Sequence, residues 1–104
     1  MSLTASELTK WAKDNLRLIG YRLNRVNNIP VRRRKGTIEK GWSDLQGYDE
    51  QGIYVAVEVK TINDKLSQEQ IDRLNDIVKC NGKAFICTEL NNEAILQKWE
   101  EMKS

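Results

Sequence analysis

Apolar residues recur at helical spacing in two long segments of the chain. Between residues 4 and 19 they fall every three to four positions, as on one buried helix face. Thr4 and Glu7 stand three residues apart at its start, as in a capping box, and Gly20 follows its end. The same spacing returns at Ser67 and stops at Asn81-Gly82. The pattern predicts two helices, with inward residues Leu8, Trp11, Ala12, Leu16 and Ile19 in the first and Ile71, Leu74, Ile77 and Val78 in the second.

Alternating or short apolar runs fill the rest of the chain. They predict strands over residues 21–26, 42–48, 53–60 and 83–88. After these, Asn91 or Asn92 is expected to cap a last helix, which would carry Ile95, Leu96, Trp99 and Met102. The predicted order is helix, three strands, helix, strand, helix. We therefore expect an α/β fold with a mixed four-stranded sheet flanked by helices and a C-terminal helix.

The strand over residues 53–60 carries charges on one of its two faces. Alternation places four apolar residues on one side, Ile53, Val55, Val57 and Val59, and Tyr54, Ala56, Glu58 and Lys60 on the other. Charges in a central strand are costly unless they are paired or bind an ion. Glu58 and Lys60 are therefore candidates for a functional site, and the alternative is an exposed ion pair on a solvated face.

Asp44 favours the functional interpretation. A hairpin with its tip at residues 49–52 would fold Asp44 back towards Glu58. Two carboxylates and the carbonyl of Val59 would offer the oxygen ligands that Mg²⁺ prefers. Lys60 beside such an ion could polarise an attacking water or offset charge in a transition state.

The composition limits the chemistry that the chain can use. Its 104 residues have room for a single domain, 1–104, and the chain contains no His, which excludes His-ligated zinc and a His general base. Cys80 and Cys87 are too far apart for a CxxC clip, and we expect both to be buried free thiols. No apolar run approaches the roughly 18 residues of a membrane span, and the polar start is unlike a signal peptide. We expect a cytoplasmic protein that makes no membrane contact.

The positive charge of the chain is concentrated in one stretch. The net charge is +2, but residues 22–40 hold seven basic residues against Glu39 alone, a local +6 that leaves −4 elsewhere. Such a stretch is typical of a nucleic-acid binder, and the alternative is a solvated loop. The candidate nucleic-acid-binding residues are Arg32, Arg33, Arg34, Lys35 and Lys40.

The candidate residues resemble a known signature. Asp44 followed by Glu58-x-Lys60 after a hairpin is similar to the PD-(D/E)xK nuclease motif, and more narrowly to the VRR-NUC domains in their stand-alone phage and bacterial form. The resemblance covers residues 7–88. It rests on Val31-Arg32-Arg33, Gly41-Trp42-Ser43-Asp44-Leu45, Val57-Glu58-Val59-Lys60-Thr61, Leu66-Ser67-Gln68-Glu69-Gln70 and Asn81-Gly82-Lys83-Ala84.

The resemblance implies a restriction-endonuclease-like αβββαβ core and a role for each matching residue. Asp44 and Glu58 would be metal ligands, together with the carbonyl of Val59, and Lys60 would be the catalytic lysine. Gln70 would approach the metal site from the second helix, and Glu7 would touch it through water or a second ion. Helix capping is the alternative for both Gln70 and Glu7.

Two residues depart from the pattern of the relatives. Ser43 stands where the superfamily name has Pro, at a position that shapes a turn and binds nothing. Trp11 stands where relatives often have a polar residue, which leaves the number of metal ions open.

The resemblance implies an enzyme, a Mg²⁺-dependent endonuclease that hydrolyses DNA phosphodiester bonds, with Mn²⁺ able to substitute. It points to branched DNA, such as Holliday junctions or flaps, in a bacterial or phage-infected cytoplasm. The alternative is a catalytically weak DNA-binding module, or a subunit of a larger nuclease complex. Stand-alone relatives imply a homodimer, for which Ile38 and Trp42 are candidate contact residues; Trp42 could instead be a core or base-stacking residue.

Overall fold

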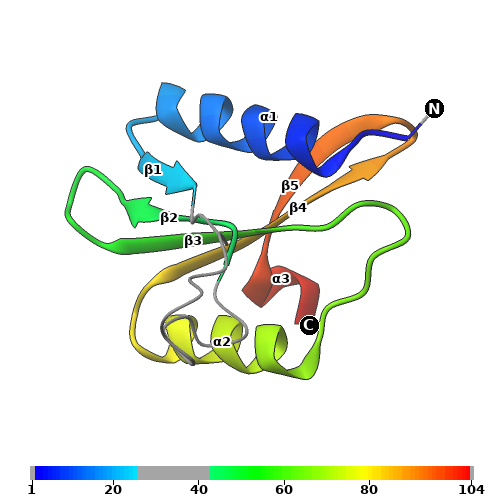
Figure 1. Ribbon diagram of the computed structural model, residues 1–104. Coiled ribbons are helices and arrows are strands. Elements are labelled where there is room, and N and C mark those ends of the chain that lie inside the picture. Colours follow the sequence, from blue (N-terminus) through cyan, green and yellow to red (C-terminus); the bar gives the residue numbers. More distant parts are fainter. Residues whose placement is uncertain (1, 26–42, 104) are drawn as a thin grey trace, which may run out of the picture.

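The computed structural model describes residues 2–25 and 43–103 (Figure 1). Its elements, in chain order, are α1 (Ala5–Leu18), β1 (Arg22–Arg25), β2 (Leu45–Tyr48), β3 (Tyr54–Val59), α2 (Gln68–Lys79), β4 (Lys83–Leu90), β5 (Glu93–Lys98) and α3 (Trp99–Lys103). The basic residues Arg32, Arg33, Arg34, Lys35 and Lys40, and the candidate dimer residues Ile38 and Trp42, lie outside the described residues.

The described strands form one mixed sheet in the order β1-β2-β3-β4-β5. Strands β3 and β4 are parallel, joined through α2, and the other neighbours are antiparallel. The sheet has α1 on one face and α2 and α3 on the other (Figure 1). Strand β3 is therefore central, with helices covering both of its faces.

The C-terminal segment corrects one sequence prediction. Residues 93–98 form a fifth strand, and the helix that was expected to start at Asn91 or Asn92 is confined to Trp99–Lys103. Asn91 and Asn92 have φ angles of 54° and 65°. Positive φ at two successive residues makes a two-residue hairpin turn, whereas a helix N-cap needs extended backbone. The turn pairs Leu90 with Glu93 and adds β5 to the sheet.

Both long helices begin with the predicted capping boxes. The Thr4 side chain accepts a hydrogen bond from the backbone N–H of Glu7, and Ser67 does the same for Gln70. Leu8, Ala12 and Leu16 are buried on the inward face of α1, whereas Ile19, expected on that face, lies beyond the helix and is exposed. The helical periodicity is thus confirmed within the helix and fails at its end.

The core consists of one apolar layer on each face of the sheet. The layer under α1 includes Leu45, Val55, Val57 and Val59, and the layer under α2 includes Ala56, Leu74, Ile86 and Trp99. The predicted alternation of β3 is confirmed, because its valines face α1 and its even-numbered residues face α2. Glu58 therefore belongs to the α2 side of the sheet.

An ion pair holds the tip of the β2–β3 hairpin against β4. Asp49 is buried, and its Oδ1 accepts hydrogen bonds from the backbone N–H groups of Gln51 and Ile53. Its Oδ2 accepts a 2.6 Å hydrogen bond from Nζ of Lys83, which lowers the pKa of Asp49 below its usual value. The Lys83 ammonium also lies 5.2 Å from the centre of the Tyr21 ring. This Asp49–Lys83 clamp fixes the end of the sheet opposite to Asp44.

The two cysteines differ in exposure. Cys87 is buried in β4, and burial raises the pKa of its thiol to about 11. Cys80 is exposed, contrary to the expectation, because it is the C-cap residue of α2 and lies at the surface end of that helix. No helix in residues 2–25 and 43–103 is long and apolar enough to cross a membrane.

Candidate metal and catalytic site

Glu58 is a carboxylic acid buried in the middle of the fold. Its side chain is 2% exposed, and it lies on the face of β3 that α2 covers. Its Oε1 accepts a 2.9 Å hydrogen bond from Nε2 of Gln70. Its Oε2 is buried and, among residues 2–25 and 43–103, has no partner at hydrogen-bonding geometry, although the side chains of Asp44 and Ser43 lie close enough to shift the pKa of Glu58. A buried oxygen without a partner is costly, which makes the Glu58 carboxyl a candidate ligand for a cation.

Asp44 lies beside Glu58, as the hairpin predicted. The antiparallel register pairs Leu45 with Val57, which brings the residue before β2 level with the residue after Val57. The Oδ2 atom of Asp44 accepts a 2.9 Å hydrogen bond from the backbone N–H of Val59. The carboxylate therefore takes the place that a strand carbonyl would occupy if β2 extended further.

The backbone carbonyl of Val59 is a second oxygen that points towards the Asp44 carboxylate. In an antiparallel pair, the N–H and C=O of one residue point to the same neighbouring strand. Because the N–H of Val59 points to Asp44, its carbonyl also points to the β2 side of β3, beyond the first residue of β2. The backbone of the next residue, Lys60, points to the opposite neighbouring strand, and its N–H donates to the carbonyl of Cys87 on the β4 side.

The pKa of Glu58 reflects its surroundings. Burial, and then the nearby Asp44 carboxylate, raise the pKa of Glu58 to about 8, and Lys60 partly opposes this rise. A bound cation would favour the ionised form of Glu58 and so oppose the effects of burial and of the neighbouring carboxylate on its pKa.

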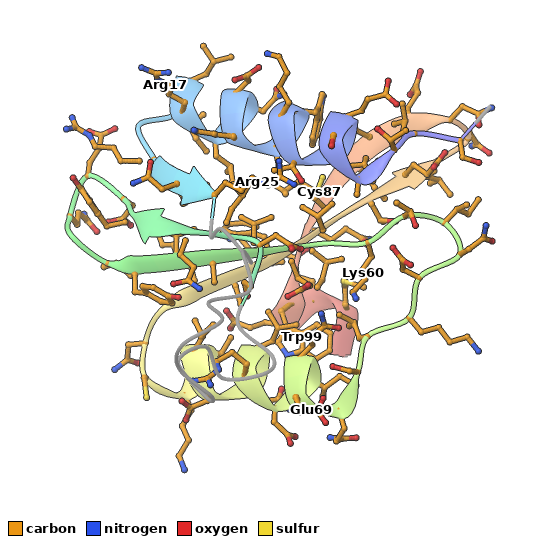
Figure 2. All side chains as sticks on the ribbon, in the orientation of Figure 1. Arg17, Arg25, Lys60, Glu69, Cys87 and Trp99 are labelled. Atoms are coloured by element: carbon orange, nitrogen blue, oxygen red, sulfur yellow. The ribbon has the colours of Figure 1, made fainter. Side chains whose placement is uncertain are left out.

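Lys60 is half-buried directly after β3. Figure 2 shows its side chain on the same side of the sheet as Trp99, the side that α2 and α3 cover. Glu58 faces that side too, and Lys60 lowers the pKa of Glu58 electrostatically. The Lys60 ammonium group is therefore close enough to interact electrostatically with negative charge at Asp44 and Glu58.

Gln70 makes a hydrogen bond in each of the two directions that the sequence left open, towards the helix start and towards Glu58. Its Oε1 accepts a 2.9 Å hydrogen bond from the backbone N–H of Ser67, which completes the capping box of α2. Its Nε2 donates the bond to Glu58. The roles are compatible because a side-chain amide has an acceptor at one end and a donor at the other.

Glu7 is not brought into contact with this group. It is exposed at the start of α1, where its Oε1 accepts a 2.9 Å hydrogen bond from the backbone N–H of Thr4. This capping contact lowers the pKa of Glu7. Within residues 2–25 and 43–103, no three acidic or cysteine side chains gather at one place. The structure therefore gives Glu7 a capping contact and joins Asp44, Glu58, Lys60 and Gln70 in one group.

Ser43 is a residue that sequence reasoning treated as a turn former only. It is 1% exposed, and its side chain lies near Glu58, whose pKa it lowers. Its position directly before Asp44 was the one available signal. The structure thus places a buried hydroxyl group next to the two candidate ligands.

Comparison with known proteins agrees with this geometry. The family model of the VRR-NUC domain matches residues 8–89. The chain is similar in structure to Hjc of *Archaeoglobus fulgidus*, a Holliday junction resolvase from an archaeal hyperthermophile, with a TM-score of 0.60 and 16% sequence identity. The alignment covers 89% of this chain and 75% of that protein, and it confirms the restriction-endonuclease-like fold. No curated protein sequence matches the chain significantly. The family match spans most of the chain and includes Asp44, Glu58 and Lys60, so the chain belongs to the VRR-NUC family of nuclease domains.

Proposed function

We propose that this nuclease domain is a divalent-metal-dependent endonuclease that hydrolyses DNA phosphodiester bonds. The observation that carries the proposal is the unpartnered Oε2 of Glu58, buried beside the carboxylate of Asp44. An oxygen kept free at this place is available to a cation.

The residues present fit Mg²⁺ or Mn²⁺. The donors would be the carboxylates of Asp44 and Glu58 and the carbonyl of Val59, all oxygen atoms, and oxygen ligands suit these ions. The chain offers no His to attract a softer metal. A divalent ion held there would supply Lewis-acid activation of the scissile phosphate.

The protein's own groups would do the remaining work. The Lys60 ammonium would offset the negative charge that grows on the phosphate as water attacks phosphorus and the P–O ester bond breaks. Gln70 would hold the Glu58 carboxylate in one orientation through its 2.9 Å hydrogen bond. Water supplies the hydroxyl of the new phosphate end, and the leaving alcohol takes up a proton.

We further propose that the preferred substrate is branched DNA, such as a four-way junction or a flap. The similarity in fold to a Holliday junction resolvase supports this choice. A junction presents two symmetric strands, so we propose that the protein acts as a homodimer, with one site for each strand. The cytoplasm of a bacterium or a phage-infected cell would supply both DNA and Mg²⁺.

One experiment tests the proposal. The purified protein is incubated with labelled duplex, flap and four-way-junction DNA, and with RNA of the same sequences, in Mg²⁺, Mn²⁺ or EDTA. We expect cleavage of branched DNA that needs a divalent ion and is absent in Glu58→Gln. Binding without cleavage in any ion would instead identify a DNA-binding module or a subunit that needs a partner. Light scattering of the same sample should give about twice the 12.1 kDa mass of the chain.

A further inference from the structure

A basic groove lies apart from the candidate active site, where the end of α1 meets β1. Its volume is about 270 Å³. Lys13 and Arg17 line it from α1, Arg22 and Asn24 from β1, and Tyr48 from the end of β2. Figure 2 shows Arg17 at the end of α1 that lies above β1. Three elements of the fold therefore contribute to one surface.

The lining of the groove is cationic and contains no acid. Lys13 and Arg17 are four residues apart, so they share one face of α1. Within the described part of the chain, neither they nor Arg22 forms a salt bridge, whereas Lys10 is paired with Asp14. Asn24 and Tyr48 add a side-chain amide and a hydroxyl group. Asp14, which is paired with Lys10, also feels the charges of Arg17 and Lys13. Cations next to neutral hydrogen-bond donors are the groups that hold nucleic-acid phosphates.

The groove runs along the edge strand β1 and is lined from both faces of the sheet, because Lys13 and Arg17 come from α1, which covers the face opposite to Glu58. Leu23 and Leu45 face α1, so alternation puts Arg22, Asn24 and Tyr48 on the other face, together with Asp44. Tyr48 is four residues from Asp44 along one extended segment, which is roughly 13 Å at the rise of a strand. In a duplex that follows this direction, that distance spans about four base pairs.

We propose that this groove binds the phosphate backbone of the DNA substrate, a few base pairs from the bond that is cut. The inference rests on the proposed function in one respect: it takes the DNA substrate of this nuclease as the molecule that occupies the groove. Contacts to phosphates do not distinguish one base sequence from another. They fix the direction and register of the duplex over Asp44 and Glu58. The groove would act in addition to the basic stretch at Arg32–Arg34, which lies outside the described residues.

The test compares two variants with the same change in charge. Lys13→Gln/Arg17→Gln removes two cations of the groove, and Gln is a good helix former at both positions. Lys79→Gln/Lys98→Gln removes two exposed lysines, one from the end of α2 and one from β5 at the opposite edge of the sheet. Binding of a labelled four-way junction and of a duplex is measured in EDTA over a range of salt concentrations.

The groove variant should bind DNA roughly tenfold or more weakly at low salt, and its plot of log affinity against log salt should be about two units shallower. The control variant should keep the wild-type slope. Arg22→Gln, on a different element, should lower the slope by about one unit. Thermal melting of each variant checks that the fold is intact.

Equal slopes for the wild type, the groove variant and Arg22→Gln would overturn the proposal. An equal loss of DNA affinity in the groove and control variants would also overturn the proposal, because only the net charge of the protein would then matter. These measurements need no metal and no cleavage. A wild-type protein that binds DNA through the groove but cuts nothing would refute the proposed function alone.

Discussion

Gln70 joins the start of α2 to the carboxylate of Glu58, through one side-chain amide that donates to the acid and accepts from Ser67. The position of the helix and the orientation of the candidate metal ligand are therefore coupled. Gln70→Ala should lower metal affinity by about 10- to 100-fold, as for the loss of an outer hydrogen bond to a ligand. It should also destabilise the fold by about 1 kcal/mol through the lost capping contact.

Ser67→Ala separates these two effects. It removes the capping hydroxyl but leaves the bond to Glu58, so it should lower the melting temperature without changing metal affinity measured by calorimetry. If both variants lose metal affinity equally, Gln70 acts only through the stability of α2.

Asp44→Asn and Glu58→Gln should each abolish cleavage and leave the fold intact. Both changes remove a ligand charge at nearly constant volume, so binding of DNA in EDTA should persist. Cleavage assays in Mg²⁺ and in Mn²⁺ test the first part, and gel-shift titrations test the second. Full activity of either variant in both ions would disprove the assignment of the ligands.

Lys60→Ala should separate catalysis from metal binding. Lys60 supplies no metal ligand in the proposed site, and its loss removes a positive charge beside the ion. Metal affinity should therefore stay the same or rise, while kcat falls by roughly two to three orders of magnitude. Loss of metal binding together with activity would give Lys60 a structural role instead.

The raised pKa of Glu58 predicts how the stability of the metal-free protein depends on pH. The pKa is 4.5 for the unperturbed group and about 8 in the folded protein. Between these values the folded protein holds a proton that the unfolded chain has released. The free energy of unfolding should therefore fall as pH rises through this window, and this contribution should level off outside it.

Glu58→Gln removes this titration. The variant should melt at a higher temperature than the wild type at pH 8, and the difference should shrink towards pH 4.5. Melting curves recorded in EDTA at several pH values give the comparison. A constant difference across the range would show that Glu58 does not titrate as proposed.

The sequence predicted the elements of the site better than the C-terminal part of the fold. Asp44 and Glu58 could be related because a short hairpin determines which residues face each other. Asn91 and Asn92 could not be assigned locally, since Asn suits both a helix N-cap and a turn with positive φ. The spacing of Ile95, Leu96 and Trp99 also fitted a helix. Pairing with β4, a contact that no local pattern encodes, decided the outcome.

Ser43 and Gln70 show the same limit within the site. Gln70 matched two motifs, and only the position of Glu58 above the start of α2 shows that one side chain satisfies both. The burial of Ser43 depends on the packing around Asp44, which the sequence does not describe. Residue identity thus predicted the candidate ligands, and the groups that surround them required the three-dimensional structure.

The Asp49–Lys83 clamp gives the β2–β3 hairpin two ends of unequal strength. The tip is held by an ion pair and by two backbone hydrogen bonds to Asp49, whereas the other end contains a buried acid with an unpartnered oxygen. Local opening of the metal-free protein should begin at the weaker end. In hydrogen exchange, the amide of Val59, held by the Asp44 carboxylate, should exchange sooner than that of Ile53, which is held by the Asp49 carboxylate that Lys83 fixes in place. If the ion binds as proposed, Mg²⁺ should slow exchange at Val59 far more than at Ile53, so the end of the hairpin that holds Asp44 should be the end whose opening depends on metal.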